Sequence, residues 1–292
     1  MFITAETEFW PNFFFWCFLR GVPVIVVNGR ISDRSFVRYL RFRWFFRPFL
    51  QRVSLFLMQS EEDARRILAL GALEGSVEVT GNTKYDVNSV PAELPVEVRN
   101  WAESSFLLVA GSTHGGEEEI ILNALEMTGL SDVRLALVPR HPERFNEVAD
   151  LLADRGIPFA RLSGIVDGRE ISERVILVDA MGVLDGFYEQ ADAAFVGGSL
   201  VPVGGHNLLE PAMHGVPVLT GPNLQNFREI TDALIKAGGC RIVEDGDSLA
   251  NALRSLKDNW QEWERMGNAA KSVFARRTGA ARRDVDAIFS LR

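Results

Sequence analysis

The chain has 292 residues, of which 47% are hydrophobic and 24% are charged, and its net charge is −8. This composition is typical of a soluble globular protein, and the length allows two cores of ordinary domain size. The longest apolar run near the start, residues 13–19, is far shorter than the ~20 residues that cross a bilayer, and no basic signal-peptide segment precedes it. The two cysteines, Cys17 and Cys240, and the four histidines lack metal-binding spacing, so we expect a reducing compartment.

The charge is distributed unevenly. Residues 1–92 carry 11 Lys or Arg and 9 Asp or Glu, a balance of +2, whereas the rest carries 20 and 30, a balance of −10. The stretch RSFVRYLRFRWFFRPFLQR interleaves arginines with aromatic residues and holds no acid. It either lies on an anionic lipid surface or forms core helices whose arginine stems point outward, and the excess of bulky aromatics favours the lipid surface. The arginines expected at lipid head groups are Arg34, Arg38, Arg41, Arg43 and Arg47.

The first elements in chain order predict a parallel α/β domain. Phe2 and Ile3 end a strand, residues 4–7 form a loop, and Pro11 suits the first turn of a helix. Further strands are predicted at 24–27, 55–58 and 77–79. The segment SEEDARRILALG predicts a helix between an N-cap at Ser60 and a stop at Gly71. Residues 89–95 are proline-rich and predict a linker, which gives domains of 1–92 and 93–292.

The second half repeats the alternation of strands and helices. Strands are predicted at 106–110, 135–138, 175–178, 193–196 and 216–219, and the chain as a whole is α/β with doubly wound parallel sheets. Glycine pairs, histidines and the sequence Arg-His-Pro all follow directly after these strands. Because the carboxyl ends of parallel strands share one edge of a sheet, we expect these residues to line a single ligand site.

The segment GGHNLLEP is the most specific part of that edge. Gly204 and Gly205 allow a tight turn, and Pro211 must lie near a helix start, which places Glu210 in the first turn. A carboxylate there can accept hydrogen bonds from two ribose hydroxyls while backbone N–H groups bind a phosphate. The alternative is a capping box of Asn207 and Glu210, although capping leaves His206 unexplained.

Other residues at strand ends have two interpretations each. Arg140 and His141 suit phosphate or base contacts, or Arg140 forms a surface ion pair. Met181, beside a turn at Gly182, frames a nucleobase or belongs to a plain turn. Ser112 and Thr113 cradle an anion or cap the next helix, and the acids that follow them, GGEEE, suit the helix dipole.

The first domain offers three charged candidates and the chain offers two aspartate pairs. Lys84 follows the strand 77–79 and can offset charge on a leaving group, or is simply solvated. Glu6 and Glu8 are candidates for base or charge-stabilising work, and one of the two is expected to be structural. The segments DGD at 245–247 and DVD at 284–286 imitate a metal motif, but we expect solvated acids away from the site.

Six motifs occur in the order ETEFWPN, GRISDRSF, VTGNTKYD, GSTHGGEE, VPRHPERF and FVGGSLVPVGGHNLLEP. In these motifs, which extend over essentially the whole chain, the sequence resembles the bacterial Kdo transferases. The resemblance implies a GT-B fold of two Rossmann-like domains. It implies an inverting enzyme that moves 3-deoxy-D-manno-octulosonic acid (Kdo) from CMP-Kdo to a lipid A precursor (lipid IVA) in lipopolysaccharide core biosynthesis, with no metal or other cofactor.

The resemblance also implies partners and residue roles. The partners are CMP-Kdo and the lipid A precursor, with no nucleic acid, and the location is peripheral, on the cytoplasmic face of the bacterial inner membrane. Glu6 or Glu8, together with Lys84, would stabilise the transition state. The residues implied to bind CMP are Pro139, Arg140, Met181, Gly182, Val183, Asn207, Leu208, Leu209 and Glu210. The neighbouring residues expected to contact the anion or the sugar are Ser112, Thr113, His141, Gly204, Gly205, His206, Gln225 and Asn226.

The sequence departs from the family pattern in two places. Gly115 stands where the family usually has Glu, so it receives no role. No position matches the family's catalytic base, a carboxylate in an early Gly-rich loop, or its membrane anchor. We therefore expect an incomplete first domain with FITAETEFW at an exposed sheet edge, and little or no transfer by this chain. A CMP-binding remnant, or another GT-B enzyme that uses a UDP-sugar, remain the alternatives.

Overall fold

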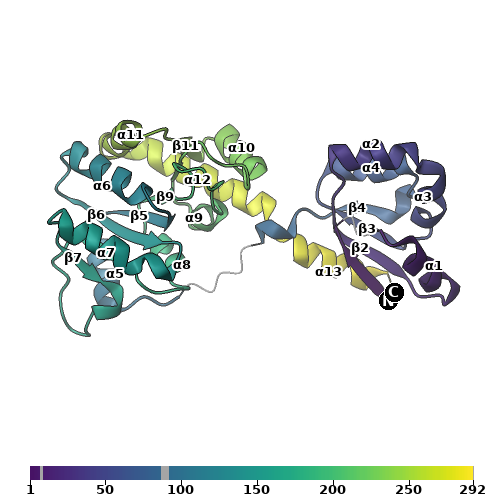
Figure 1. Ribbon diagram of the computed structural model, residues 1–292, viewed down its shortest axis with the longest axis horizontal. Helices are drawn as coiled ribbons and strands as arrows, with labels where there is room; N and C mark the ends of the chain where they lie inside the picture. Colours follow the sequence, from purple (N-terminus) through teal and green to yellow (C-terminus); the bar gives the residue numbers. More distant parts are fainter. Residues whose placement is uncertain (7–8, 87–91, 292) are drawn as a thin grey trace. The chain divides into compact units, whose positions relative to one another are not determined.

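The computed structural model describes residues 1–6, 9–86 and 92–291 (Figure 1). It divides into two compact units. Unit 1 comprises Met1–Val87 and Arg277–Arg292, and unit 2 comprises Asn88–Arg276. The sequence analysis divided the chain at residue 92 and assigned everything after it to the second domain. The structure instead returns the last residues of the chain to unit 1.

Unit 1 contains a four-stranded parallel sheet in the order β1-β2-β3-β4. The strands lie close to the predicted positions, and β1 is an edge strand, as expected, with Ile3 47% exposed. The Ser60 hydroxyl accepts a hydrogen bond from the Asp63 amide, and Gly71 ends that helix in a left-handed conformation, so both predicted helix signals are confirmed. The elements are β1 (Phe2–Ala5), α1 (Pro11–Leu19), β2 (Val24–Gly29), α2 (Asp33–Arg41), α3 (Arg43–Leu50), β3 (Leu55–Met58), α4 (Glu61–Leu70), η1 (Glu74–Ser76), β4 (Val77–Val79), η2 (Thr83–Tyr85) and α13 (Ala280–Ser290).

The sheet of unit 1 is covered on both faces. Alternate residues of β2 point to opposite sides, as the strand period requires, so Val24 and Val26 pack with α1, α3 and α4 while Ile25 lies on the other face. That other face is covered by Ala287 and Ile288 of α13 (Figure 1). The C-terminal helix therefore completes the hydrophobic core of the N-terminal unit.

Unit 2 contains a seven-stranded, fully parallel sheet in the order β11-β10-β9-β5-β6-β8-β7. The predicted strands are all present, although β10 begins two residues later than expected. The structure adds β7 and β11, which the sequence analysis did not predict; each has three residues and lies at an edge of the sheet. The strands are β5 (Phe106–Thr113), β6 (Val133–Pro139), β7 (Phe159–Arg161), β8 (Val175–Leu177), β9 (Ala193–Val196), β10 (Val218–Thr220) and β11 (Cys240–Ile242).

Helices cover both faces of this sheet, so the doubly wound architecture is confirmed. One core contains Leu108 and Phe195 with α6, α7, α11 and α12, and the other contains Leu107 and Ala194 with α5 and α8. The helices are α5 (Val96–Glu103), α6 (Glu117–Thr128), η3 (Pro142–Arg144), α7 (Phe145–Asp154), η4 (Leu162–Gly164), α8 (Leu184–Glu189), α9 (Leu209–His214), α10 (Arg228–Ala237), α11 (Gly246–Asp258) and α12 (Trp260–Arg277).

Helix α1 is apolar around most of its circumference. Phe14 and Cys17 are buried in the core of unit 1, whereas Phe13, Trp16 and Leu19 are each more than half exposed. The helix has nine residues. Within the part of the chain that the structure describes, none of the helices has both the length and the apolar character needed to cross a bilayer.

Candidate nucleotide-sugar site

The centre of the unit 2 sheet is a topological switch point. From β5 the chain continues to β6 on one side, and it later returns to β9 on the other side of β5. The loops after β5 and β9 therefore lie at the carboxyl ends of the strands on either side of this point, where open α/β sheets bind ligands. Ser112 is the second-last residue of β5 and adopts a left-handed φ of 55°, which is rare for a residue with a side chain. This conformation marks the end of β5 as constrained.

Glu117 fastens the two loops together. Its buried carboxylate accepts hydrogen bonds from the backbone amides of His114 (2.9 Å), Gly198 (2.7 Å), Ser199 (2.9 Å) and Leu200 (2.9 Å). Gly198 has a φ of 66°, and a Cβ there would lie 2.9 Å from the His206 ring, so glycine is required on both counts. The sequence analysis interpreted the acids of GGEEE through the helix dipole alone and missed this role.

Glu118, the next acid, is buried as well. Its carboxylate pairs with the Arg144 guanidinium at 2.6 Å, which joins α6 to the loop after β6. Glu119 is exposed and fits the original interpretation. Glu117 and Glu118 thus hold together the loops around the candidate site, whereas Glu119 does not.

Three histidines meet above the switch point. The Nε2 atoms of His114 and His206 are 2.8 Å apart and their rings are nearly parallel, while the His141 ring stands edge-on to His114 with centroids 5.3 Å apart. They follow β5, β9 and β6, which are neighbours in the sheet. The structure therefore brings together two predicted site residues, His141 and His206, with His114, to which the sequence analysis gave no role.

Glu210 lies in the first turn of α9, as predicted, and is partly buried. Burial raises the pKa of its carboxyl and the neighbouring Asp185 adds to this, whereas Arg140 and a hydrogen bond from Asn207 lower it. Asp185 itself lies 2.8 Å from the ring of His214. Asn207 also accepts a hydrogen bond from the Leu209 amide, but the N-cap of α9 is Leu208 without a side-chain cap, so the alternative of a capping box between Asn207 and Glu210 is wrong.

Arg140 is exposed at the end of β6, next to the buried Pro139, and its side chain makes no ion pair with any residue in the described ranges. Its charge acts on both Glu210 and His206, lowering the pKa of each. The alternative of a surface ion pair therefore finds no partner among residues 1–6, 9–86 and 92–291. Arg140 stands between the histidine group and Glu210 as a cation available to a ligand.

The remaining predicted contacts differ in accessibility. Met181 is 57% exposed at a turn in which Gly182 has a φ of 81°, and Val183 precedes α8.

Gln225 and Asn226 are exposed, and the backbone amide of Asn226 donates a hydrogen bond to the carbonyl of Gly204 at 3.1 Å. A Cβ at Gly204 would lie 2.4 Å from the Asn226 side chain, which explains the glycine. Gly205, Leu208 and Leu209 are buried, so the side chains of the two leucines are not accessible to a ligand.

The expectations for Ser112 and Thr113 need correction. Both lie within β5, which extends further than predicted, and the N-cap of α6 is Gly116 without a side-chain cap. The capping interpretation is therefore wrong. Thr113 is fully buried and cannot contact a ligand through its side chain, whereas Ser112 is partly exposed.

The candidates of unit 1 also follow strand ends. Glu6 comes directly after β1 with a left-handed φ of 56°, and it is exposed. Glu8 lies outside the described residues, as does the side chain of Lys84. The backbone around Lys84 is described, and Asn28 at the end of β2 accepts a hydrogen bond from the Thr83 amide at 3.1 Å. Asn28, the second-last residue of β2, has a φ of 51°, so a strained residue at the carboxyl end of each of two neighbouring strands marks this edge as well.

The expectation for the DVD segment was wrong in part. Asp284 is buried beneath the loop after β4, with 5% of its surface exposed, because α13 packs against unit 1. Burial raises the pKa of its carboxyl. Asp286 is exposed, as predicted, and Asp245 caps α11 through a reciprocal hydrogen-bond pair with Ser248.

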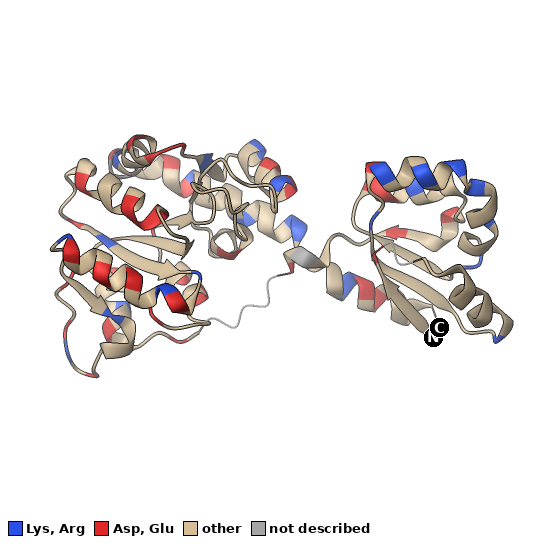
Figure 2. Ribbon diagram, in the orientation of Figure 1, with Lys and Arg blue, Asp and Glu red and all other residues tan. Residues whose placement is uncertain are grey.

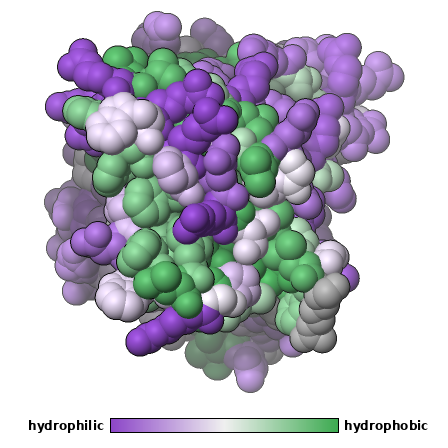
Figure 3. All heavy atoms as spheres, turned by 90° about the vertical axis from the view of Figure 1, so that its right-hand side faces the viewer, coloured by the Kyte–Doolittle hydropathy of each residue, from purple (hydrophilic) through white to green (hydrophobic). Residues whose placement is uncertain are grey.

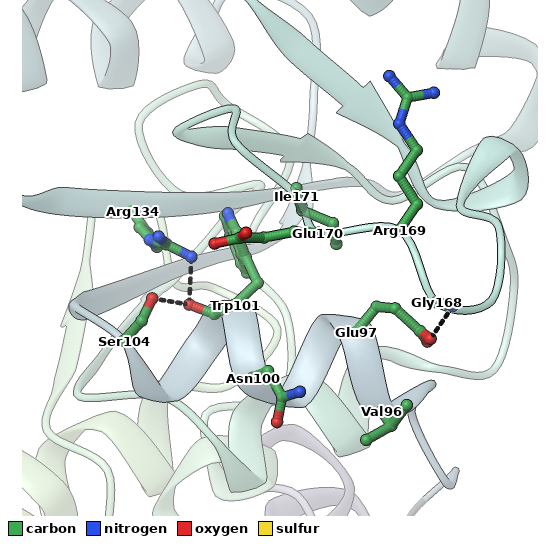
Figure 4. A pocket seen from close by; sticks show the side chains of 10 residues that line it. All are labelled: Val96, Glu97, Asn100, Trp101, Ser104, Arg134, Gly168, Arg169, Glu170 and Ile171. Atoms are coloured by element: carbon green, nitrogen blue, oxygen red, sulfur yellow. Dashed lines mark hydrogen bonds between the residues drawn. The ribbon is translucent and has the colours of Figure 1, made fainter.

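A cavity of about 490 Å³ lies at the opposite end of unit 2 (Figure 4). It is formed by α5, the start of β6 and the loop before β8. The Arg134 guanidinium stacks on the Trp101 ring and bonds to its carbonyl, and Glu97 bonds to the Gly168 amide at 2.6 Å. These polar groups already serve the fold, so the cavity is not the candidate site.

The comparison with known proteins decides the family. Residues 1–87 match the family model described as 3-deoxy-D-manno-octulosonic-acid transferase (kdotransferase). The chain is 39% identical over 291 residues to the 3-deoxy-D-manno-octulosonic acid transferase of Haemophilus influenzae, which covers 97% of this chain and 68% of that protein. The chain belongs to the Kdo transferase family. A second family member, from Bordetella pertussis, is 31% identical and covers 98% of this chain and 68% of its own length.

Two solved structures support the same fold class. The C-terminal CMP-Kdo binding domain of WaaA from Acinetobacter baumannii is 34% identical, with a TM-score of 0.55, and covers 60% of this chain and 92% of that chain. The putative UDP-N-acetylglucosamine 2-epimerase of Listeria monocytogenes covers 99% of this chain and 73% of its own, with a TM-score of 0.55 but 17% identity. The second likeness concerns the fold alone. Together with the two parallel sheets, these matches confirm the predicted GT-B class.

Proposed function

We propose that this Kdo transferase family member acts in the transfer of Kdo from CMP-Kdo to a lipid A precursor (lipid IVA), a step of lipopolysaccharide core biosynthesis. Family membership supports the sugar and the glycosyl transfer. The likeness to a domain described as CMP-Kdo binding supports the donor. The acceptor is inferred from the family.

The observation that carries the donor assignment is the pairing of an accessible cation with an accessible carboxylate at the switch point. Glu210 is partly buried, which strengthens hydrogen bonds to its carboxylate, and Arg140 acts on it from the end of the neighbouring β6. A ribose with two adjacent hydroxyls suits Glu210, and a phosphate suits Arg140. The exposed Met181 and the Gly182–Val183 backbone supply an apolar and hydrogen-bonding surface for the cytosine.

The reaction that we infer is an inverting displacement. An acceptor hydroxyl forms a bond to the anomeric carbon of Kdo while the bond from that carbon to the phosphate oxygen breaks, and CMP leaves with the electron pair. The hydroxyl proton passes to the family's base, a carboxylate that no residue of this sequence matches, while Glu6 or Glu8, together with Lys84, offsets charge in the transition state. A monophosphate leaving group carries less charge than a diphosphate, so protein cations suffice and the reaction needs no metal or other cofactor.

The acceptor is an anionic lipid, and one face of unit 1 suits a membrane surface. Arg34, Arg38, Arg41, Arg43 and Arg47 are all exposed on or beside α2 and α3 (Figure 2). Apolar side chains gather on the face of unit 1 that Figure 3 shows, and among the residues of α1 and α3 Phe13, Trp16 and Trp44 are 51%, 57% and 76% exposed. Exposed aromatics beside arginines favour insertion at an anionic interface. We therefore propose a peripheral position on an anionic membrane surface, which the family resemblance implies is the cytoplasmic face of the inner membrane.

Calorimetric titration tests the donor assignment. CMP should bind with a 1:1 stoichiometry and more tightly than UMP or UDP. Tighter binding of UDP than of CMP would overturn the assignment and favour a UDP-sugar enzyme. Lipid IVA incubated with this chain and CMP-Kdo should gain little or no Kdo mass, because no residue matches the family's catalytic base, and a robust gain would contradict that expectation.

A further inference from the structure

The three histidines above the switch point form a group that the proposed nucleotide contacts do not use. His114 and His206 share a 2.8 Å contact between Nε2 atoms, and His141 stands against the His114 ring. They come from the loops after three adjacent strands, and Arg140 precedes His141 directly. The group therefore lies at the point in the sheet where a ligand is expected.

The contact between the two Nε2 atoms limits the charge that the pair can carry. A hydrogen bond between them needs an N–H on one ring and a lone pair on the other, so the rings cannot both be imidazolium ions while it exists. Burial lowers the pKa of His206 to about 4, and the charges of His114, Arg140 and His141 add to this. Burial likewise lowers the pKa of His114. Without a ligand, both rings are neutral at neutral pH.

The carboxylates nearest to the pair are already occupied. Glu117 and Glu118 raise the pKa of His114, but Glu117 is held by four backbone amides and Glu118 by Arg144. The charged groups otherwise facing the pair are cations: Arg140, Arg144 and, when protonated, His141. Apart from Glu143, whose exposed carboxylate lies 3.9 Å from Nδ1 of His141, the described residues around the pair supply positive charge and hydrogen-bond donors.

We propose that the His114–His206 pair, with His141, is a binding site for the anionic group of the nucleotide sugar, and that the pair takes up a proton from solvent when this anion binds. The proposal rests on the proposed function, since it names a further contact of the same donor. An anion within a few ångströms favours the charged form of an imidazole by ~1–3 pKa units. The added proton occupies Nδ1 of the ring that donates from Nε2, so the hydrogen bond between the rings persists and a further N–H becomes available to the ligand. Binding thereby converts a neutral pair into a cation.

Calorimetry in two buffers of different ionisation enthalpy measures this proton directly. At pH 6.5 the binding of CMP should take up several tenths of a proton more in the wild-type chain than in the His206→Gln variant. The comparison with the variant is needed because the second pKa of a phosphate monoester is about 6. CMP and Glu210 therefore contribute to the total proton uptake in both proteins. His114→Gln should lose the same uptake. His214→Gln, which removes the histidine outside the group, should keep it.

A comparison of CMP, cytidine and CMP-Kdo distinguishes which anion the histidines bind, the phosphate or the Kdo carboxylate. If the phosphate is bound here, CMP causes the uptake and cytidine does not. If the Kdo carboxylate is bound here, CMP-Kdo adds an uptake that CMP lacks. Binding of both ligands with the same proton count in wild type and in both variants would overturn the proposal while leaving the nucleotide assignment intact. Failure of CMP to bind at all would instead reject the proposed function. Circular dichroism of each variant checks that the fold is retained.

Discussion

At the scale of single residues, Glu210 carries the nucleotide assignment. Replacing it with Ala should weaken CMP binding by ~1–3 kcal/mol, because a charged acceptor for the ribose hydroxyls is lost. Calorimetric titration measures the change. The control is Glu189→Ala, which removes an exposed acid at the end of α8 and should leave the affinity unchanged. Equal affinities for all three proteins would remove Glu210 from the site.

Glu117, in contrast, is expected to contribute to the free energy of unfolding of the protein. Its carboxylate accepts four backbone hydrogen bonds in a fully buried position. In Glu117→Gln one oxygen becomes an NH₂ group that faces donors, so the free energy of unfolding should fall by about 3 kcal/mol or more. Urea denaturation measures it, with the exposed Glu119→Gln as the matched control. A difference below about 1 kcal/mol between the two variants would contradict the anchoring role.

These two residues also show what sequence patterns reveal about a site. The position of Glu210 follows from local rules, since Pro211 must lie near a helix start. The role of Glu117 depends on a loop that lies more than eighty positions further along the chain. Three consecutive acids at a helix start look alike in the sequence, and only the packing of the β9 loop on Glu117 and of Arg144 on Glu118 separates the buried pair from the exposed Glu119.

At the scale of elements, α13 is the piece that the sequence analysis placed in the wrong unit. Asp86 follows Lys84 in the loop after β4. Its carboxylate accepts hydrogen bonds from the backbone amides of Gly279 (2.6 Å), Ala280 (3.0 Å) and Ala281 (2.6 Å). Arg283 bonds to the Thr80 carbonyl at 2.7 Å. The C-terminal helix therefore braces the loop at 80–86.

Loss of this brace should be visible as local opening. In Asp86→Asn the amide offers one acceptor in place of a charged carboxylate, so amides of residues 80–86 should exchange with deuterium at least about tenfold faster, which corresponds to ~1.4 kcal/mol. Peptides of β5 and β9 should not change. Asp286→Asn, which changes an exposed acid of α13, is the control, and unchanged exchange at 80–86 in Asp86→Asn would argue against the brace.

The elements themselves were mostly predictable. Strands such as β3 and β9 are continuous apolar runs, which the buried strands of parallel sheets favour. β7 and β11 were missed because each is a three-residue edge strand with partly exposed side chains, which leaves no apolar run to detect. The docking of α13 was missed because its partner strands lie near the other end of the chain, and an amphipathic helix does not encode which sheet it covers.

At the scale of the whole molecule, the asymmetric charge predicts a directed attachment to lipid. Replacing Arg41, Arg43 and Arg47 with Ser removes three charges from unit 1 and should reduce binding to vesicles that contain anionic lipid, most strongly at low salt. At roughly 1 kcal/mol per arginine near the surface, a loss of tenfold or more is expected in a sedimentation assay.

A matched variant separates location from net charge. Arg228, Arg265 and Arg276 are exposed in unit 2, and replacing them with Ser gives the same net charge. This variant should bind the vesicles as the wild-type chain does. Equal losses in both variants would mean that overall charge, and not the arginine-rich face of unit 1, governs attachment.

Unit 1 draws its hydrophobic core from both ends of the chain, and this has a consequence for biosynthesis. The whole of unit 2 is translated before α13. Unit 2 can therefore fold on the ribosome while the face of the unit 1 sheet that α13 covers is still exposed. During that interval Ile25, Leu55 and Leu57 have no helix over them. The nascent protein should therefore depend on chaperones most strongly just before its last residues emerge, and slower elongation there should increase its tendency to aggregate.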